Sequence, residues 1–290
     1  LIVYHNPIFE KNTPIDDERI VTDDYLDRVT DALIHGAELA EKAGFDGVDI
    51  KCCHRYLNSE LLSAFERTGR YGGSLENRTR LLRESIRGAK SRCGREFLVT
   101  TRLNVYDGFP YPYGFGVSQN GDIAFDPTES IWLLQQLRDS GVHLVNITMG
   151  NPYFNPHVNR PYAQGNYTPP EHPLEGVARM LNGTAQLKKF VPELKYICSA
   201  MSYLGVAAPQ VAAAFIAQGG FDLAGFGRTA LAYPDFAHDI LDSGEMKKEK
   251  ICICCSKCTQ IMRQSGGTPG CVVRDREVYL PIYKEKCGAK

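Results

Sequence analysis

The sequence predicts an α/β fold made of strand–helix units in series, followed by a short cysteine-rich segment. Three observations lead to this prediction. A unit in which a helix ends at glycine and an apolar strand follows recurs along the chain, and six short apolar segments alternate with segments of helical periodicity. In addition, six of the 10 cysteines fall in the last 39 of the 290 residues.

The repeated unit is clearest at Gly44, Gly141 and Gly220, each of which precedes a short apolar segment. Glycine readily adopts the left-handed conformation that ends a helix, and strands covered on both faces are apolar throughout. The first long helix is expected to begin at Thr22, whose hydroxyl can cap it. Six strands in this order fit either an incomplete (β/α)8 barrel or an open doubly wound sheet. The candidate strands are residues 2–4, 47–50, 97–103, 143–148, 195–200 and 222–225.

Charge and hydropathy exclude several classes of partner. A net charge of −1 gives no basic surface for nucleic acid or an anionic membrane, and no apolar run reaches membrane-spanning length. The first residues lack the stages of a signal peptide, which together with the thiol content predicts a cytoplasmic protein that acts on a small molecule. Because LIVYH reads as a strand already under way, the natural N-terminus is expected upstream.

Four cysteines are predicted metal ligands: Cys252, Cys255, Cys258 and Cys271, spaced C-x2-C-x2-C-x12-C. Three clustered thiolates and one distant thiolate are typical of a [4Fe-4S] cluster, whereas zinc usually takes two separated pairs. Structural zinc stays open as the alternative, and a disulfide framework is a weaker one. Cys254 and Cys287 lie close enough in sequence to replace one of the four.

A second candidate site follows the strand at 47–50, where Lys51, His54 and Tyr56 offer an ammonium, an imidazole and a phenol. Such a group can polarise a carbonyl and deliver a proton, although ordinary loop residues satisfied by local contacts remain the alternative. Two loops rich in aromatic residues, Gly and Pro, at 106–115 and 150–173, also follow strands. In a barrel such loops hold substrate, and a surface lid is the alternative reading.

The last strand ends at Gly225-Phe226-Gly227-Arg228, which suits a phosphate seat. Continued to Ala230, the same segment fits the dinucleotide fingerprint G-x-G-x-x-A, but that interpretation requires a following βαβ unit.

Five segments together carry a family resemblance. They resemble, in order, the flavin-dependent old yellow enzyme family, and in particular its iron–sulfur branch, which contains 2,4-dienoyl-CoA reductase, bile-acid enoate reductases and trimethylamine dehydrogenase. The resemblance covers nearly the whole chain. The segments are GFDGVDIKCCHRYLNSELLSAF, YGGSLENRTR, TTRLNVYDG, AGFGRTALAYPDF and the cysteine segment.

The resemblance implies a TIM barrel with FMN at the C-terminal ends of its strands. The chain begins at what matches the third barrel strand, so a barrel lacking its first two strands is expected. Residues 1–245 are then a partial FMN-binding barrel and residues 246–290 the iron–sulfur segment, without the FAD- and NAD(P)-binding domains of the larger relatives.

By matched position, the resemblance also implies roles for individual residues. Arg102 faces the flavin N1/C2 carbonyl, while Gly227 and Arg228, with Ser202, hold the phosphate. Tyr56 is the proton donor.

His54 and Lys51 occupy the two substrate-anchoring positions. Lys51 replaces a residue that is commonly His or Tyr, which favours a more anionic substrate group. His157, in NPHVNRP, lies near a further active-site histidine of the dienoyl reductases.

The expected function is therefore an FMN- and [4Fe-4S]-dependent ene-reductase that acts on an α,β-unsaturated carbonyl, with hydride from flavin N5 and a proton from Tyr56. The cluster receives electrons from a donor protein, or NAD(P)H reduces the FMN directly. A homo-oligomer is compatible with the sequence. Two alternatives are an amine dehydrogenase on the same scaffold, which the x2 spacing between the second and third cysteines favours, and a zinc-stapled, non-catalytic barrel remnant.

Overall fold

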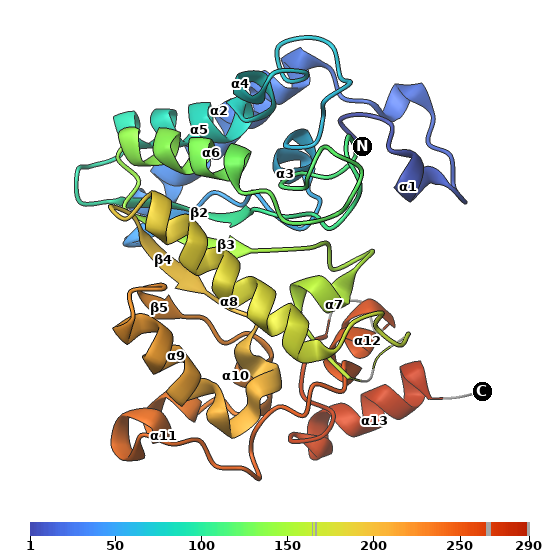
Figure 1. Ribbon diagram of the computed structural model, residues 1–290, viewed down its shortest axis with the longest axis vertical. Helices are drawn as coiled ribbons and strands as arrows, with labels where there is room; N and C mark the ends of the chain where they lie inside the picture. The colour runs from blue at the N-terminus through green and yellow to red at the C-terminus, as the bar shows by residue number, and fades with distance from the viewer. Residues whose placement is uncertain (164, 166, 265–267, 289–290) are drawn as a thin grey trace. The chain divides into compact units, whose positions relative to one another are not determined.

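A computed structural model describes residues 1–163, 165, 167–264 and 268–288. The chain divides into two compact units (Figure 1). The first unit comprises Leu1–Asn159 and Gly183–Cys198, and the second comprises Arg160–Asn182 and Ser199–Lys290. The predicted boundary between residues 245 and 246 remains a prediction.

A parallel sheet in the order β1-β2-β3-β4 forms the centre of the first unit. Its strands are β1 (Gly47–Asp49), β2 (Leu98–Asn104), β3 (Leu144–Thr148) and β4 (Lys195–Cys198). Val99, Thr101 and Leu103 alternate along β2 and are buried, because this face of the sheet is covered by helices. The opposite face carries Thr100 and Arg102, where polar side chains gather.

The first unit contains short helical turns and longer helices that connect its strands. Helix α2 packs against β1 and α5, and α5 packs against β2 and α6 (Figure 1). The helical segments are α1 (Pro7–Glu10), η1 (Asp17–Arg19), α2 (Asp23–Lys42), α3 (Leu57–Leu61), α4 (Leu75–Arg78), α5 (Arg80–Arg92), α6 (Thr128–Asp139) and α7 (Pro156–Asn159).

The second unit contains the strand β5 and most of the C-terminal helices. Helix α8 (Pro173–Phe190) contributes residues to both units. The remaining elements are η2 (Met201–Ala207), α9 (Ala208–Ala217), β5 (Leu223–Ala224), α10 (Arg228–Ala232), α11 (Phe236–Ser243), α12 (Lys257–Gln264) and α13 (Arg276–Cys287).

The predicted start of the first long helix is confirmed, since the Thr22 hydroxyl accepts a hydrogen bond from the backbone N–H of Tyr25 at 3.2 Å. Gly44 and Gly141 have φ values of +84° and +82°, as predicted for residues that end helices. The third position is corrected by one residue. Gly219 has the positive φ of +76°, and Gly220 donates its N–H back to the carbonyl of Phe215.

Five of the six candidate strands are confirmed in part of their length, and the first one is wrong. At residues 2–4 only Ile2 pairs, through an isolated bridge with Ile20. The chain leaves the extended conformation because Asn6 caps α1 and Pro7, which has no N–H to donate to a ladder, begins that helix. Val3 and Tyr4 are instead held by buried side chains. Within the described residues, no helix combines the length and apolar character needed to cross a bilayer.

Candidate active site and cysteine cavity

The segment after β1 places three predicted site residues on a sharply turned loop. Cys52 still pairs with β2, donating to the carbonyl of Arg102 and accepting from the N–H of Asn104. His54 and Arg55 then have φ values of 63° and 59°, in the left-handed region that non-glycine residues rarely adopt. Two consecutive residues of this kind turn the chain, and backbone strain held in this way is common at functional sites.

Lys51 and Tyr56 are in direct contact. The Nζ atom of Lys51 lies 3.3 Å from the centroid of the Tyr56 ring, which is a close cation–π contact. The Tyr56 side chain is 51% exposed, and its hydroxyl lies 3.0 Å from the hydroxyl of Tyr153. An accessible phenol therefore lies beside an ammonium group and is held by a second phenol.

His54 lies next to the short helix that contains His157. Its Nε2 atom is 3.4 Å from the amide nitrogen of Asn159, which also donates to the Thr148 hydroxyl and the Met149 carbonyl. Asn159 is two residues from His157 on α7. The structure thus connects the loop of His54 with the NPHVNRP segment through Asn159.

Asn159 and Tyr153 were both missed by sequence reasoning, although they lie in the loop at 150–173 that was flagged for its composition. Each of the two residues contacts a predicted site residue that is about a hundred positions away in the chain. Contacts over such a separation are visible only in the folded structure.

Arg102 lies on the polar face of β2, opposite Asn146 in the register of β3. Its backbone N–H donates to the Asp49 carboxylate at 2.8 Å. Among the described residues, the buried Nε of Arg102 and the buried Oδ1 of Asn146 have no hydrogen-bond partner. A donor and an acceptor on neighbouring strands are therefore left for a bound group, since unsatisfied buried polar atoms are costly.

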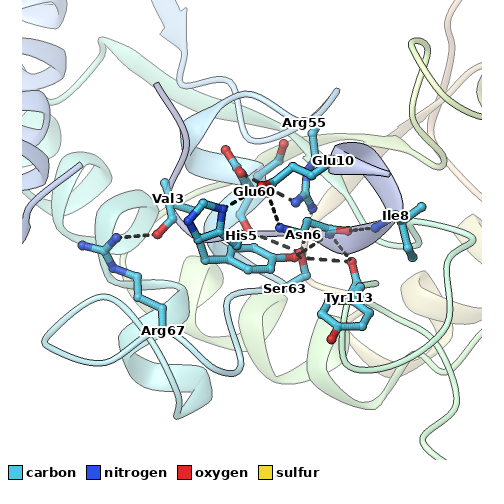
Figure 2. A network of polar contacts seen from close by, with 12 residues as sticks. Val3, His5, Asn6, Ile8, Glu10, Arg55, Glu60, Ser63, Arg67 and Tyr113 are labelled. Carbon is cyan, nitrogen blue, oxygen red and sulfur yellow. Dashed lines mark hydrogen bonds and ion pairs between the residues drawn. The ribbon is translucent and has the colours of Figure 1, made fainter. Parts of the chain in front are cut away.

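A buried charged network lies beneath the loop. Arg55 donates to the Ser63 hydroxyl at 3.0 Å and forms an ion pair with Glu60 at 3.6 Å (Figure 2). Burial raises the pKa of Glu60 to about 7, although the Arg55 charge lowers it. Burial likewise raises the pKa of Asp107 to about 6, against the Arg55 charge and the N–H of Phe115. Sequence reasoning did not identify these residues.

The N-terminal segment joins this network. Figure 2 shows Asn6 and Glu10 close to Glu60 and Ser63. The backbone N–H of Asn6 donates to Glu10 at 2.7 Å, and the Tyr4 hydroxyl lies 2.9 Å from the Ser63 hydroxyl. Arg55 therefore connects the candidate active-site loop to the residues that precede α2.

The second unit brings the four predicted ligands together. Cys252, Cys255, Cys258 and Cys271 line one cavity, and Cys254 and Cys287 are absent from its described lining. The N–H of Cys254 donates to the Cys252 sulfur at 3.3 Å, and that of Arg274 donates to the Cys271 sulfur at 3.4 Å. No three His, Cys, Asp or Glu side chains in the described part of the chain are arranged to hold a single metal ion.

The loop that carries the first three of these cysteines has an unusual backbone. Cys254 and Ser256, which alternate with the predicted ligands, have φ values of 52° and 61°. In the described structure the buried Ser256 hydroxyl, which also lines the cavity, has no partner. Thiolates that bind a cluster are commonly surrounded by N–H and O–H donors of this kind.

The predicted phosphate residues lie in the same unit. The Thr229 hydroxyl donates to that of Ser202 at 3.1 Å, and a Cβ added at Gly227 would meet nothing within 4 Å. Arg228 donates through Nη2 to the carbonyl of Pro161 and lines the cysteine cavity. The sequence did not predict this contact between Arg228 and the cysteine site.

Residues 3–129 match the family described as NADH:flavin oxidoreductase / NADH oxidase. The matched segment includes the loop with Lys51, His54 and Tyr56, and the strand with Arg102. Through this segment, the chain is similar to the enzymes of the NADH:flavin oxidoreductase family.

Two curated relatives show how the similarity to this family is distributed. Cinnamate reductase of Clostridium sporogenes is 41% identical over 90 residues, which are 30% of this chain and 14% of the relative. A probable N-methylproline demethylase of Rhizobium meliloti is 24% identical over 275 residues, 91% of this chain and 36% of the relative. The chain thus spans only 14% and 36% of the lengths of these two relatives.

The similarity in fold extends beyond residues 3–129. A solved 2-naphthoyl-CoA reductase in complex with 2-naphthoyl-CoA has a TM-score of 0.68 with this chain at 23% identity, covering 89% of this chain and 35% of the other. The chain therefore shares an α/β fold with that enzyme over most of its length.

Proposed function

We propose that the protein is an FMN- and [4Fe-4S]-dependent oxidoreductase that reduces the C=C bond of an α,β-unsaturated carbonyl, either an enoate or an enoyl thioester. The observation that carries this proposal is the group formed by Lys51, Tyr56 and Tyr153. It combines a positive charge with an exposed phenol, which suits a substrate that carries negative charge on one side and accepts a proton on the other.

The residues of the first unit fit FMN. The pyrimidine edge of a flavin presents a carbonyl oxygen that accepts hydrogen bonds and an N–H that donates one. Arg102 Nε and Asn146 Oδ1, one donor and one acceptor, would satisfy these two groups and be satisfied by them. The Arg102 charge would also stabilise negative charge on the ring. When bound, FMN would supply the hydride.

The residues of the second unit fit a four-iron cluster. Four thiols on one cavity, with backbone N–H groups directed at two of the sulfurs, match the donor set that such clusters use. The cluster would pass electrons from a donor protein, with NAD(P)H as the alternative electron source. Gly227 and Arg228, with Ser202, would hold the phosphate of the cofactor, because open space adjoins Gly227.

In the proposed reaction, Lys51 and His54 would bind the carbonyl or carboxylate of the substrate and draw electron density toward its oxygen. Tyr56 would donate its phenolic proton to the α carbon. Tyr153 would hold the Tyr56 hydroxyl in place through the 3.0 Å contact, and Asn159 would hold His54. His157, on the same helix as Asn159, would contact the substrate on the other side.

An amine dehydrogenase is the second candidate, because one relative is named a demethylase and the cysteine spacing agrees with it. The position of Lys51 favours the reductase, since an ammonium group 3.3 Å from the Tyr56 ring repels a cationic amine. A zinc-stapled, non-catalytic protein is the third reading and differs from both in its metal.

The test is to purify the protein without oxygen, measure its iron, sulfide, zinc and flavin, and follow flavin absorbance in rapid mixing. After reduction, cinnamate should reoxidise the flavin, whereas the oxidised protein should not react with a tertiary amine. The Tyr56→Phe variant should be reduced normally and be reoxidised 10²- to 10⁴-fold more slowly, the range for loss of a general acid. Reduction by the amine supports the dehydrogenase, and a colourless zinc protein supports the third reading.

A further inference from the structure

Two partly buried arginines lie against the cysteine segment. Arg160 donates through Nη1 to the hydroxyl of Thr259 at 2.7 Å, and Thr259 directly follows the predicted ligand Cys258. The Nε atom of Arg160 is buried and has no partner in the described structure. One end of this guanidinium is therefore fixed to the cysteine segment, while the other end has an unused donor.

Arg228 is the second arginine. It donates through Nη2 to the carbonyl of Pro161, the residue after Arg160, and it lines the same cavity as the four cysteines. Its Nη1 atom is buried and, in the described part of the chain, has no acceptor. Arg160 and Arg228 are thus linked through adjacent backbone residues and both approach the cysteine site.

Among the described residues, the two arginines have no carboxylate partner. Neither forms an ion pair with Asp or Glu in the residues that the structure describes. Burial lowers the pKa of Arg160, and the charges of Arg228 and Arg263 lower it further, while the Cys258 thiol acts in the opposite direction. Partly buried cations that repel each other are stabilised by a nearby anion, because charge removed from water is unfavourable unless it is compensated.

We propose that Arg160 and Arg228 form a cationic bracket that compensates the negative charge of a thiolate-bound iron–sulfur cluster in the cysteine cavity and raises its reduction potential. Four thiolates and a four-iron core with a charge of about +2 leave a net negative charge of about −2. Reduction adds one electron and makes that charge more negative. Nearby cations stabilise the reduced state more than the oxidised state.

This inference rests on the proposed function and assigns a role that the sequence did not indicate. Arg160 was not a candidate in the sequence. Arg228 keeps its proposed role at the phosphate and also lines the cysteine cavity, so the charge newly assigned to the cluster is chiefly that of Arg160. In this proposal Arg160 supplies a positive charge close to the cluster, and it is neither a ligand nor a catalytic residue.

The test is a redox titration of the full protein, purified without oxygen, with electron paramagnetic resonance as the readout. The variants are Arg160→Gln, which removes the charge, and Arg160→Lys, which keeps it. Lys284→Gln removes the same charge from an exposed position on α13 and is the matched control. Iron and sulfide are measured in every sample before titration.

Arg160→Gln should lower the reduction potential so that the one-electron equilibrium shifts about tenfold toward the oxidised cluster, or about 59 mV. Arg160→Lys should keep most of the original potential, and Lys284→Gln should leave it unchanged. Loss of iron in Arg160→Gln but not in Arg160→Lys would also support charge compensation.

Two results would overturn the bracket alone. One is an unchanged potential in iron-loaded Arg160→Gln, and the other is equal loss of iron in the Gln and Lys variants, which would assign Arg160 a purely structural role. If the unaltered protein contains no iron, the proposed cluster fails, and the bracket fails with it. The iron analysis therefore separates the two failures.

Discussion

The hydroxyl of Tyr56 lies 3.0 Å from the hydroxyl of Tyr153, and their rings are 6.4 Å apart and tilted. The predicted proton donor is thus held by a residue 97 positions away in the chain. The ammonium of Lys51 lies against the ring of the same Tyr56. Tyr56 is the N-cap residue of α3. Lys51 contacts it from the same loop and Tyr153 from a second loop, so its orientation depends on both loops.

Tyr153→Phe should slow substrate-dependent reoxidation of the flavin about fivefold, because one hydrogen bond of about 1 kcal/mol that positions the donor is lost. Flavin reduction should be unaffected. Rapid mixing measures the rates of both steps. The pH profile of reoxidation should change, and that of reduction should not. Tyr111→Phe is the control, since Tyr111 is partly exposed and packs its ring on Phe65. Equal slowing in both variants would remove Tyr153 from this role.

Lys51→Met should weaken the binding of a carboxylate substrate by about 10- to 100-fold, as expected when a charge-assisted hydrogen bond is lost. The loss should be smaller for an uncharged enone of the same size. Titration of the flavin spectrum gives both dissociation constants. The exposed Lys42→Met serves as the control. An equal loss for the acid and the enone would show that Lys51 does not recognise the anionic group.

Glu60→Gln should change how stability depends on pH. Burial raises the pKa of Glu60 from 4.5 to about 7, so between these values the folded chain holds a proton that the unfolded chain has released. The free energy of unfolding therefore falls as the pH rises through this window, by up to about 1.4 kcal/mol per pH unit. The variant should lose this part of the slope.

Urea unfolding between pH 5 and pH 8 measures the slope. The exposed Glu66→Gln should retain it, which makes this variant the control. Asp107 contributes a slope of the same sign between 3.8 and about 6, because its pKa is also raised by burial, and this contribution should persist in Glu60→Gln. A Glu60→Gln slope equal to that of the unaltered protein would contradict the raised pKa.

Arg78→Met should destabilise the first unit by about 3 to 5 kcal/mol, the range for breaking a buried ion pair. The Arg78 side chain is 2% exposed, pairs with Glu129 and donates to the Gly73 carbonyl at 2.9 Å. Its guanidinium also lies 3.8 Å from the centre of the Phe65 ring. Denaturant unfolding of the variant measures the loss.

Arg92→Met on α5 is the matched control, since Arg92 is exposed and pairs with Glu38 at 3.6 Å. Its effect should stay below about 1 kcal/mol. Similar losses in the free energy of unfolding of the two variants would show that the ion pair of Arg78 and Glu129 stabilises the fold no more than an exposed pair does.

Local chemistry made much of the fold predictable. The glycines that end helices and the Thr22 cap act within a few residues, so the sequence reveals them directly. The segment at 2–4 was predicted wrongly because an apolar run indicates burial and not pairing. Val3 and Tyr4 are indeed buried, but by side-chain packing.

The candidate site was predictable only where its residues are close in sequence. Cysteine spacing and the Lys51, His54, Tyr56 cluster were visible, whereas Tyr153, Asn159 and Arg160 act through contacts across 97 to 105 positions. The family motif YGGSLENR also has a structural explanation. Asn77 donates to the carbonyls of Gly69 and Gly72, and Arg78 is the buried ion-pair residue, so this motif stabilises a loop.

The two left-handed residues His54 and Arg55 have a consequence for how this protein can diverge. Through that turn, Arg55 contacts Ser63 and Phe9, whereas its neighbours His54 and Tyr56 contact Asn159 and Tyr153. A substitution of His54 or Tyr56 would therefore change the candidate site with little effect on the packing beneath it. A substitution of Arg55 would disturb both, so one residue links the shape of the site to the stability of the fold.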